Sequence, residues 1–215
     1  MSETLIAAII GGTISLITTI ITSAVNAVVE FKKKKNENQQ AEFEMKRENL
    51  KSVYAELIGV VNAFPNQSPN DVLKYMEDAP DFSMEFFDPV VKVLRYQRED
   101  YETRLRSGAN DFEEKGRIES EIRNRKYAQN EILKIKQQYY DAKEKQQLFN
   151  ASSKIIFDLY AGQEVKNCLV EFEVLIHNVF ISGNDAGDSS NPLNNLIEKS
   201  RRNLVYSMRR DIGIE

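Results

Sequence analysis

The sequence is poor in the residues that most catalytic and metal sites need. Its 215 residues include one Cys, one His and no Trp, which excludes a disulfide framework and a zinc site built from several Cys and His side chains. Gly-rich phosphate loops, nucleophile elbows and HExxH are absent from it. We therefore expect a non-enzymatic protein with no cofactor. An enzyme with a site made of carboxylates alone is a remaining alternative.

Glycine, proline and excess positive charge are also scarce. The chain has 9 Gly and 5 Pro, while 29% of its residues are charged, a composition typical of long helices rather than of a turn-rich β fold. The 29 Lys and Arg against 33 Asp and Glu give a net charge of -4. Because binding to a phosphate backbone needs a basic surface, nucleic acid is not expected as a partner. The fold class predicted is all-α.

One long stretch lacks charge altogether. Thr4 to Val29 contains no charged residue and, as a helix, would be about 39 Å long, more than the hydrocarbon core of a bilayer requires. We interpret residues 1–31 as a single N-terminal transmembrane helix. A cleaved signal peptide is the alternative, but the stretch has no positive start, is longer than such peptides need and ends at Glu30-Phe31 without a small-residue cleavage site.

Four lysines follow this stretch at once: Lys32, Lys33, Lys34 and Lys35. The positive-inside rule then predicts an inner-membrane protein with its N-terminus outside and its C-terminal part in the cytoplasm. Residues 32–40 are a basic and polar juxtamembrane segment under this interpretation. Specific capture of anionic lipid by the same lysines is the alternative role.

The small and polar residues of the apolar stretch share one helical face, opposite an Ile-rich side. In lipid, such a face allows close backbone approach and hydrogen bonds between helices, so it predicts a homo-oligomer within the bilayer. Polar side chains that bond back to their own helix are the simpler alternative. The predicted association face consists of Gly11, Ser15, Thr19, Thr22, Ser23 and Asn26.

Residues 41–215 are predicted to form a cytoplasmic antiparallel helical bundle. Ser68 and Pro69 form an N-cap followed by Pro at N1, which starts a short helix to about Asp78. Further helices are expected over about 89–107, from residue 111 to about 149, over about 153–181 and, capped by Asn191-Pro192, to the C-terminus. In the 111–149 helix a 4-3 spacing of Ala128, Ile132, Ile135, Tyr139 and Ala142 lasts only two heptads, which favours packing within the chain over an extended coiled coil.

The 153–181 helix is the predicted core helix. Val165, Leu169, Phe172, Ile176 and Val179 repeat the 4-3 spacing along it. Glu173 and His177 lie one turn apart on the same helix, but a di-iron site would need Glu-x-x-His spacing on two helices, so no metal is expected there. Arg201, Arg202, Arg209 and Arg210 near the C-terminus are candidate contacts for lipid or an acidic partner, unless they only complement the helix dipole.

These features favour two functions. The first is a membrane-anchored protein that self-associates through its transmembrane helix and presents the bundle to an unidentified cytoplasmic protein or signal. The second is a conditional pore-former whose hydroxyl face lines a channel. A single span followed by a helical bundle is similar to many small membrane proteins, some of them phage-defence effectors.

Overall fold

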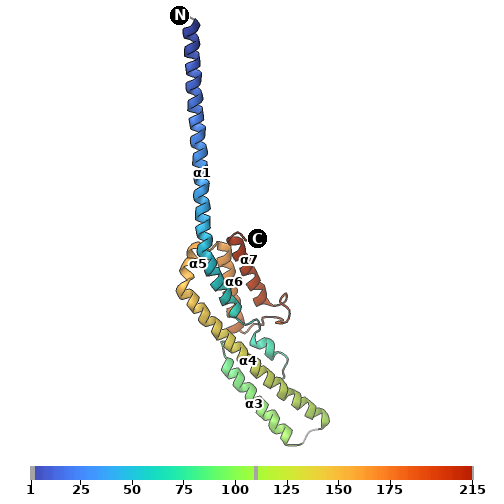
Figure 1. The fold of residues 1–215 in the computed structure, drawn as a ribbon. Coiled ribbons are helices and arrows are strands. Elements are labelled where there is room, and N and C mark those ends of the chain that lie inside the picture. Colours follow the sequence, from blue (N-terminus) through green and yellow to red (C-terminus); the bar gives the residue numbers. More distant parts are fainter. Residues whose placement is uncertain (1–2, 109–110, 215) are drawn as a thin grey trace. The chain divides into compact units, whose positions relative to one another are not determined.

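The structure, a computed structural model, describes the backbone of residues 3–108 and 111–214, and the side chains from residue 22 onwards in these ranges. The described residues form helices and no strand, so the predicted all-α class is confirmed (Figure 1). The helices in chain order are α1 (Glu3–Ala63), α2 (Pro69–Leu73), α3 (Phe87–Arg106), α4 (Phe112–Ser152), α5 (Lys154–Tyr160), α6 (Gln163–Phe180) and α7 (Leu196–Asp211).

The chain divides into two units, Met1–Glu48 and Asn49–Glu215. The first contains the predicted anchor, the juxtamembrane segment and the first eight residues of the predicted bundle, 41–48. Among the side chains that are described, no helix is long and apolar enough to cross a membrane. Residues 4–21, which make up most of the predicted span, are not among the residues whose side chains are described.

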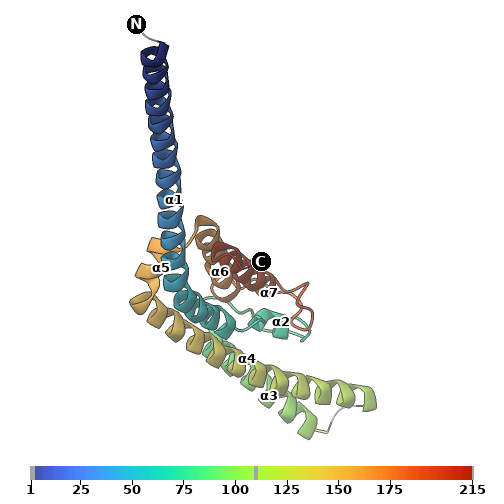
Figure 2. The same ribbon diagram turned by 45° about the horizontal axis from the view of Figure 1, so that its top comes forward.

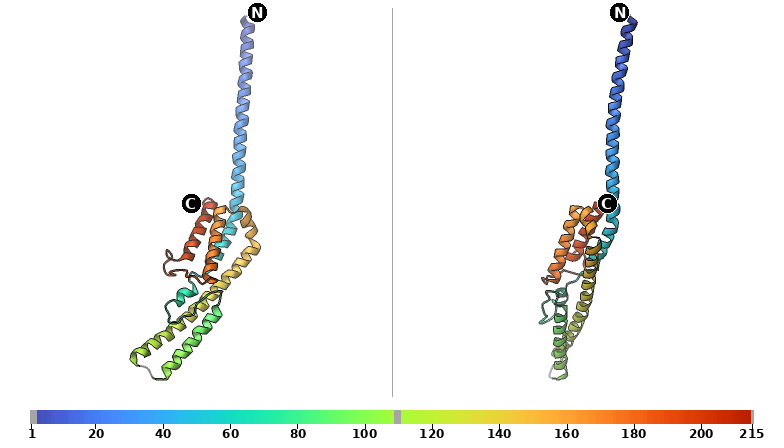
Figure 3. Two further views of the ribbon diagram at one scale, coloured as in Figure 1. Left: turned by 180° about the vertical axis from the view of Figure 1, so that it is seen from behind. Right: turned by 90° about the vertical axis from the view of Figure 1, so that its left-hand side faces the viewer.

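The second unit is built from two antiparallel helix pairs and the last turns of α1. The helices α3 and α4 lie side by side as a hairpin, and α4 is long enough to continue beyond α3 towards α5 (Figures 1 and 3). The pair α6 and α7 forms the other half (Figure 2). The short connection between Arg106 and Phe112 forces the antiparallel arrangement of α3 and α4. The pair α6 and α7 is joined by the longer segment 181–195.

One hydrophobic core joins these helices. It takes its α1 contribution from Leu50 to Val61, where buried side chains recur at helical spacing. The predicted stripe on α4 is confirmed, since Ala128, Ile132, Ile135, Tyr139 and Ala142 are all buried. The predicted core positions of α6 are confirmed too: Val165, Leu169, Phe172, Ile176 and Val179 are buried.

The prediction of one unbroken helix over 153–181 is wrong. The chain leaves the helix at Ala161 and Gly162, and Gly162 has extended backbone angles as the N-cap of α6. Its N–H donates to Asp211 Oδ2 at 3.0 Å, and the same carboxylate accepts from the Tyr54 hydroxyl at 2.5 Å. A Cβ at position 162 would lie 2.5 Å from Asp211 Oδ1. Asp211 therefore joins α1, α6 and α7, and it stabilises the break.

Two other predicted boundaries are also wrong. The helix that begins at Pro69 ends at Leu73 rather than near Asp78. Asp78 has a positive φ of 49°, and the Glu77 carbonyl accepts a hydrogen bond from Arg125. The last helix is capped by Asn195, not by Asn191-Pro192. Asn195 Oδ1 accepts from the Glu198 N–H, while its Nδ2 donates to the Asn66 carbonyl at 2.6 Å, which ties this cap to the end of α1.

Candidate functional site

A pocket of about 270 Å³ opens between α4, α6 and the C-terminal end of α1, within the second unit. Pockets that combine an apolar floor with a few convergent polar groups are the usual form of a ligand site. It is lined by Phe64, Tyr139, Lys143, Gln146, Phe172, Glu173, Ile176, His177 and Ile181.

The floor of the pocket is aromatic. The ring of Phe64 packs edge-on against Tyr139 at 6.1 Å and against Phe172 at 5.7 Å between centroids. Phe64 directly follows α1, whereas Tyr139 belongs to α4 and Phe172 to α6, and each ring is almost fully buried. Edge-to-face packing of this kind adds to the stability given by burial alone and holds the floor rigid.

The rim carries the polar groups. Gln146 on α4 donates through Nε2 to Glu173 Oε1 on α6 at 3.0 Å, so this pair bridges the two helices. His177 lies one turn after Glu173 on α6 and is exposed. On the opposite wall, Lys143 Nζ lies 5.5 Å from the centroid of the Tyr139 ring, within the range of a cation–π interaction.

Glu85 does not line the pocket, but it binds two residues that do, Lys143 and Tyr139. Its Oε1 accepts from the Tyr139 hydroxyl at 2.6 Å and from Lys143 Nζ at 3.1 Å. Burial by itself would raise the pKa of Glu85, but the hydrogen bonds from these two residues outweigh it and lower that pKa below its ordinary value. Burial, and then the hydrogen bond to Glu85, raise the pKa of Tyr139. Glu85 is therefore ionised at neutral pH while Tyr139 keeps its proton.

The backbone that presents Glu85 is unusual. Met84 and Glu85 both have a positive φ, 53° and 58°, which residues other than Gly rarely adopt. Their N–H groups donate to the carbonyls of Ile181 and Phe180 at 2.8 and 3.0 Å. These bonds use carbonyls at the C-terminal end of α6, which have no partner within the helix. The segment before α3 is thereby attached to α6 and, through Glu85, to α4.

The residues of the predicted association face are only partly described. The side chains of Gly11, Ser15 and Thr19 lie outside the described residues, whereas Thr22, Ser23 and Asn26 are exposed on α1. The basic cluster Lys32 to Lys35 is exposed on the same helix, with Lys33 Nζ 4.0 Å from Glu37. All of these residues belong to the first unit, whereas the residues that line the pocket belong to the second.

The four C-terminal arginines have different surroundings. Arg201 is buried and donates to the carbonyls of Val61, at 2.8 Å, and Phe64, which close the C-terminal end of α1. A cation suits that end of the helix dipole, so Arg201 has a role inside the fold. Arg202 donates to the Pro192 carbonyl at 2.5 Å, and Arg210 pairs with Glu164 at 3.0 Å. Arg202, Arg209 and Arg210 are at the surface, and Arg209 also has a partner within the protein.

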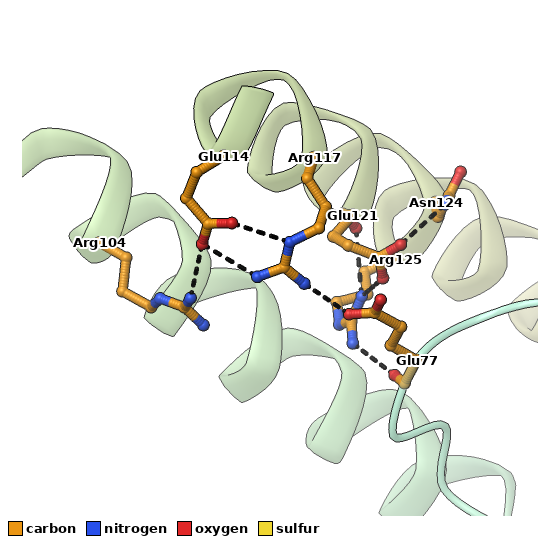
Figure 4. A network of polar contacts seen from close by, with 7 residues as sticks. All are labelled: Glu77, Arg104, Glu114, Arg117, Glu121, Asn124 and Arg125. Carbon is orange, nitrogen blue, oxygen red and sulfur yellow. Dashed lines mark hydrogen bonds and ion pairs between the residues drawn. The ribbon is translucent and has the colours of Figure 1, made fainter. Parts of the chain in front are cut away.

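A second polar cluster lies at the α3–α4 hairpin, and Figure 4 shows its members. Arg125 is 1% exposed and pairs with Glu121, while it donates to the Glu77 carbonyl at 2.7 Å. Nearer the surface, Arg117 bridges Glu114 and Glu77. Because each buried cation has acceptors within the fold, this cluster stabilises the turn after α2 against the hairpin rather than forming an open site.

Three residues at the start of α2, Ser68, Asn70 and Asp71, connect distant loops, and of these only Ser68 was predicted from the sequence, as the N-cap. Ser68 and Asp71 form the reciprocal capping box, which confirms the predicted Ser68–Pro69 helix start. Asp71 Oδ2 also accepts from the Ala186 N–H at 3.0 Å. Asn70 Nδ2 donates to the carbonyls of Phe82 and Gly183 at 2.9 and 2.5 Å. The segments before α3 and after α6 are thus attached to one short helix.

Sequence analysis did not identify the pocket. It considered Glu173 and His177 only as a metal pair, and within the described part no group of three or more His, Cys, Asp and Glu side chains is placed to hold a metal ion. Lys143 and Gln146 were missed. Their 4-3 spacing after Tyr139 indicates one face of α4, but the partner helix across the pocket is set by the fold alone.

The chain matches no known family model, and it shows no significant similarity to a curated protein or to a solved structure. Its function is therefore argued from its own residues.

Proposed function

We propose that this chain is a non-enzymatic membrane protein with one N-terminal transmembrane helix, through which it self-associates. Its helical bundle, residues 49–215, lies on the cytoplasmic side and binds a partner or a signal molecule. The apolar stretch from Thr4 to Val29 supports the anchor, and the lysines after it support the orientation.

The exposed apolar side chains near the end of that stretch carry the proposal. Val25, Val28 and Val29 are 54 to 57% exposed, and Phe31 is 72% exposed, all on one helix of the first unit. Apolar side chains that stay exposed close to one another mark a surface that meets lipid or another protein. The uncharged stretch before them favours lipid, with Lys32 to Lys35 at the level of the headgroups.

Self-association follows from the polar side chains on the same helix. Thr22, Ser23 and Asn26 are exposed, and in hydrocarbon the Asn26 amide needs a hydrogen-bond partner. A second copy of the helix offers the same groups at close range, and interhelical hydrogen bonds of this kind contribute about 0.6 to 2 kcal/mol each. Several in register would sustain an oligomer.

The test measures self-association of the full chain in lipid vesicles by energy transfer between labelled copies. We expect Gly11→Leu and Ser15→Leu to lower the transfer, because Leu separates the backbones on the association face. Ile10→Leu and Ile17→Leu, on the opposite side, are the matched controls and should leave it unchanged. Equal behaviour of both pairs would contradict the proposed face.

The same preparation addresses the pore-forming alternative. A dye that reports membrane potential, in vesicles or in cells that express the chain, should show no depolarisation if the helix only anchors and associates. Depolarisation that Ser15→Leu abolishes would replace the anchoring function by a channel.

A further inference from the structure

We propose that the pocket between α4, α6 and the end of α1 binds a small organic cation, an amine or guanidinium group carried on a compact apolar body. This inference names the ligand class for the sensing role proposed above and rests on that role only for its biological meaning. Binding to the pocket is measurable whether or not the chain self-associates.

The charge around the pocket favours a cation. Lys143 is paired with Glu85 at 3.1 Å, so these two charges offset each other. Glu173 is hydrogen-bonded only to Gln146, a neutral amide, and among the described residues no Lys, Arg or His lies within ion-pair distance of it. Together Lys143, Glu85 and Glu173 leave one net negative charge at the pocket. A cationic ligand would neutralise it, whereas an anion would be repelled.

The hydrogen-bonding groups at the mouth of the pocket also favour a cation. Gln146 Nε2 uses one of its two N–H groups in the bond to Glu173, and Lys143 uses one of its three in the bond to Glu85. Glu173 keeps the other lone pairs of its carboxylate, and Gln146 keeps its carbonyl oxygen. Glu173 is thus a charged acceptor at the mouth of the pocket with no cationic partner among the described residues, and the ligand group that complements it is a cation with N–H donors. Ammonium and guanidinium groups meet this requirement.

The floor of the pocket suits a compact apolar body that carries a cation. The rings of Phe64, Tyr139 and Phe172 offer aromatic surface to an apolar body, and aromatic rings attract cations placed over them. Lys143 already occupies one such position over Tyr139, which shows that this ring accepts a cation. At about 270 Å³ the pocket is slightly smaller than sites for drug-sized molecules, so the ligand is small.

The experiment titrates the full chain in lipid nanodiscs with phenethylamine as the cationic probe and with 3-phenylpropionate as its anionic counterpart. Ligand-observed magnetic resonance or calorimetry measures binding, and empty nanodiscs correct for partition into lipid. We expect the amine to bind and the carboxylate not to bind. Glu173→Gln keeps the shape of the side chain but removes its charge, and should weaken amine binding about tenfold.

Two further variants distinguish the charge inside the pocket from the charge on the surface of α6. Glu171→Gln changes an exposed glutamate on the same helix that does not line the pocket, and it should leave the affinity unchanged. Lys143→Met leaves Glu85 without its cation, so it should strengthen amine binding severalfold. Absence of amine binding, an equal affinity in Glu173→Gln, or preferred binding of the carboxylate that Lys143→Met abolishes would each overturn the inference. None of these results depends on energy transfer between copies.

Discussion

Two buried tyrosines make the bundle sensitive to high pH. Tyr54 donates its hydroxyl to Asp211 at 2.5 Å, and Tyr139 donates to Glu85 at 2.6 Å. Burial is the main cause that raises the pKa of each tyrosine above its ordinary value of 10.0, and the hydrogen bond to a carboxylate adds to it. In the unfolded chain both hydroxyls ionise near pH 10, whereas in the folded chain they keep their protons.

The sign of the effect follows from proton linkage. Above about pH 10 the unfolded state binds fewer protons than the folded state, so the free energy of unfolding falls as the pH rises. Each tyrosine contributes about 1.4 kcal/mol per pH unit there, and at about pH 11 the two together would have cost roughly 2.8 kcal/mol. Below pH 10 this contribution to stability is fully present.

The assay is urea unfolding of the full chain in micelles, followed by circular dichroism, near pH 8 and near pH 11. The Tyr54→Phe, Tyr139→Phe double variant should be less stable at the lower pH, because Asp211 and Glu85 each lose a donor, but should lose roughly 2.8 kcal/mol less than the parent between the two. A double variant at the exposed positions Tyr75 and Tyr127 is the control and should behave as the parent does. If the Tyr54, Tyr139 variant loses as much stability as the parent, the two hydroxyls do not retain their protons in the fold and the reasoning fails.

Two more predictions concern the core and the cap of α1. Leu169→Asp places an unpaired charge at a 6% exposed position and should lower the free energy of unfolding by several kcal/mol, whereas Val170→Asp, at a 57% exposed position on the same helix, should change it little. Equal urea midpoints for these two variants would contradict the packing of α6. Arg201→Met removes the donors to two carbonyls at the end of α1 and should cost about 3 kcal/mol, while Arg202→Met, at the surface, should cost under about 1 kcal/mol. A similar cost for both arginines, measured by the same unfolding assay, would show that the buried bonds do not stabilise α1.

The features that the sequence predicted correctly are local ones. The Ser68–Pro69 start of α2 follows from a side chain that caps its own helix three residues away. The buried faces of α4 and α6 follow from spacing alone, because residues three and four apart share one side of a helix. Such patterns extend over a few residues and do not depend on the tertiary contacts of the rest of the chain.

Predictions went wrong where polar groups far apart in the sequence meet. The break between α5 and α6 depends on the Gly162 N–H and a carboxylate 49 residues later. The cap of α7 is Asn195, whose side-chain amide donates to the Asn66 carbonyl, 129 residues earlier. A local pattern that favours helix at these positions is overridden, because a buried N–H or carbonyl must find a partner wherever the fold provides one.

The candidate site shows the same division. From the sequence, Tyr139 was identified as a packing residue, and Glu173 and His177 as neighbours on one helical face. Only the tertiary structure decided which of the charges are paired. Lys143 is neutralised by Glu85, 58 residues away, while Glu173 is not neutralised by any cation among the described residues. The sequence by itself determined the all-α class, the buried faces of α4 and α6 and the uncharged N-terminal stretch, since these depend on the order of neighbouring residues. Which charges meet, which are left over and where a pocket opens depend on the packing of whole helices against one another, and no local pattern specifies that.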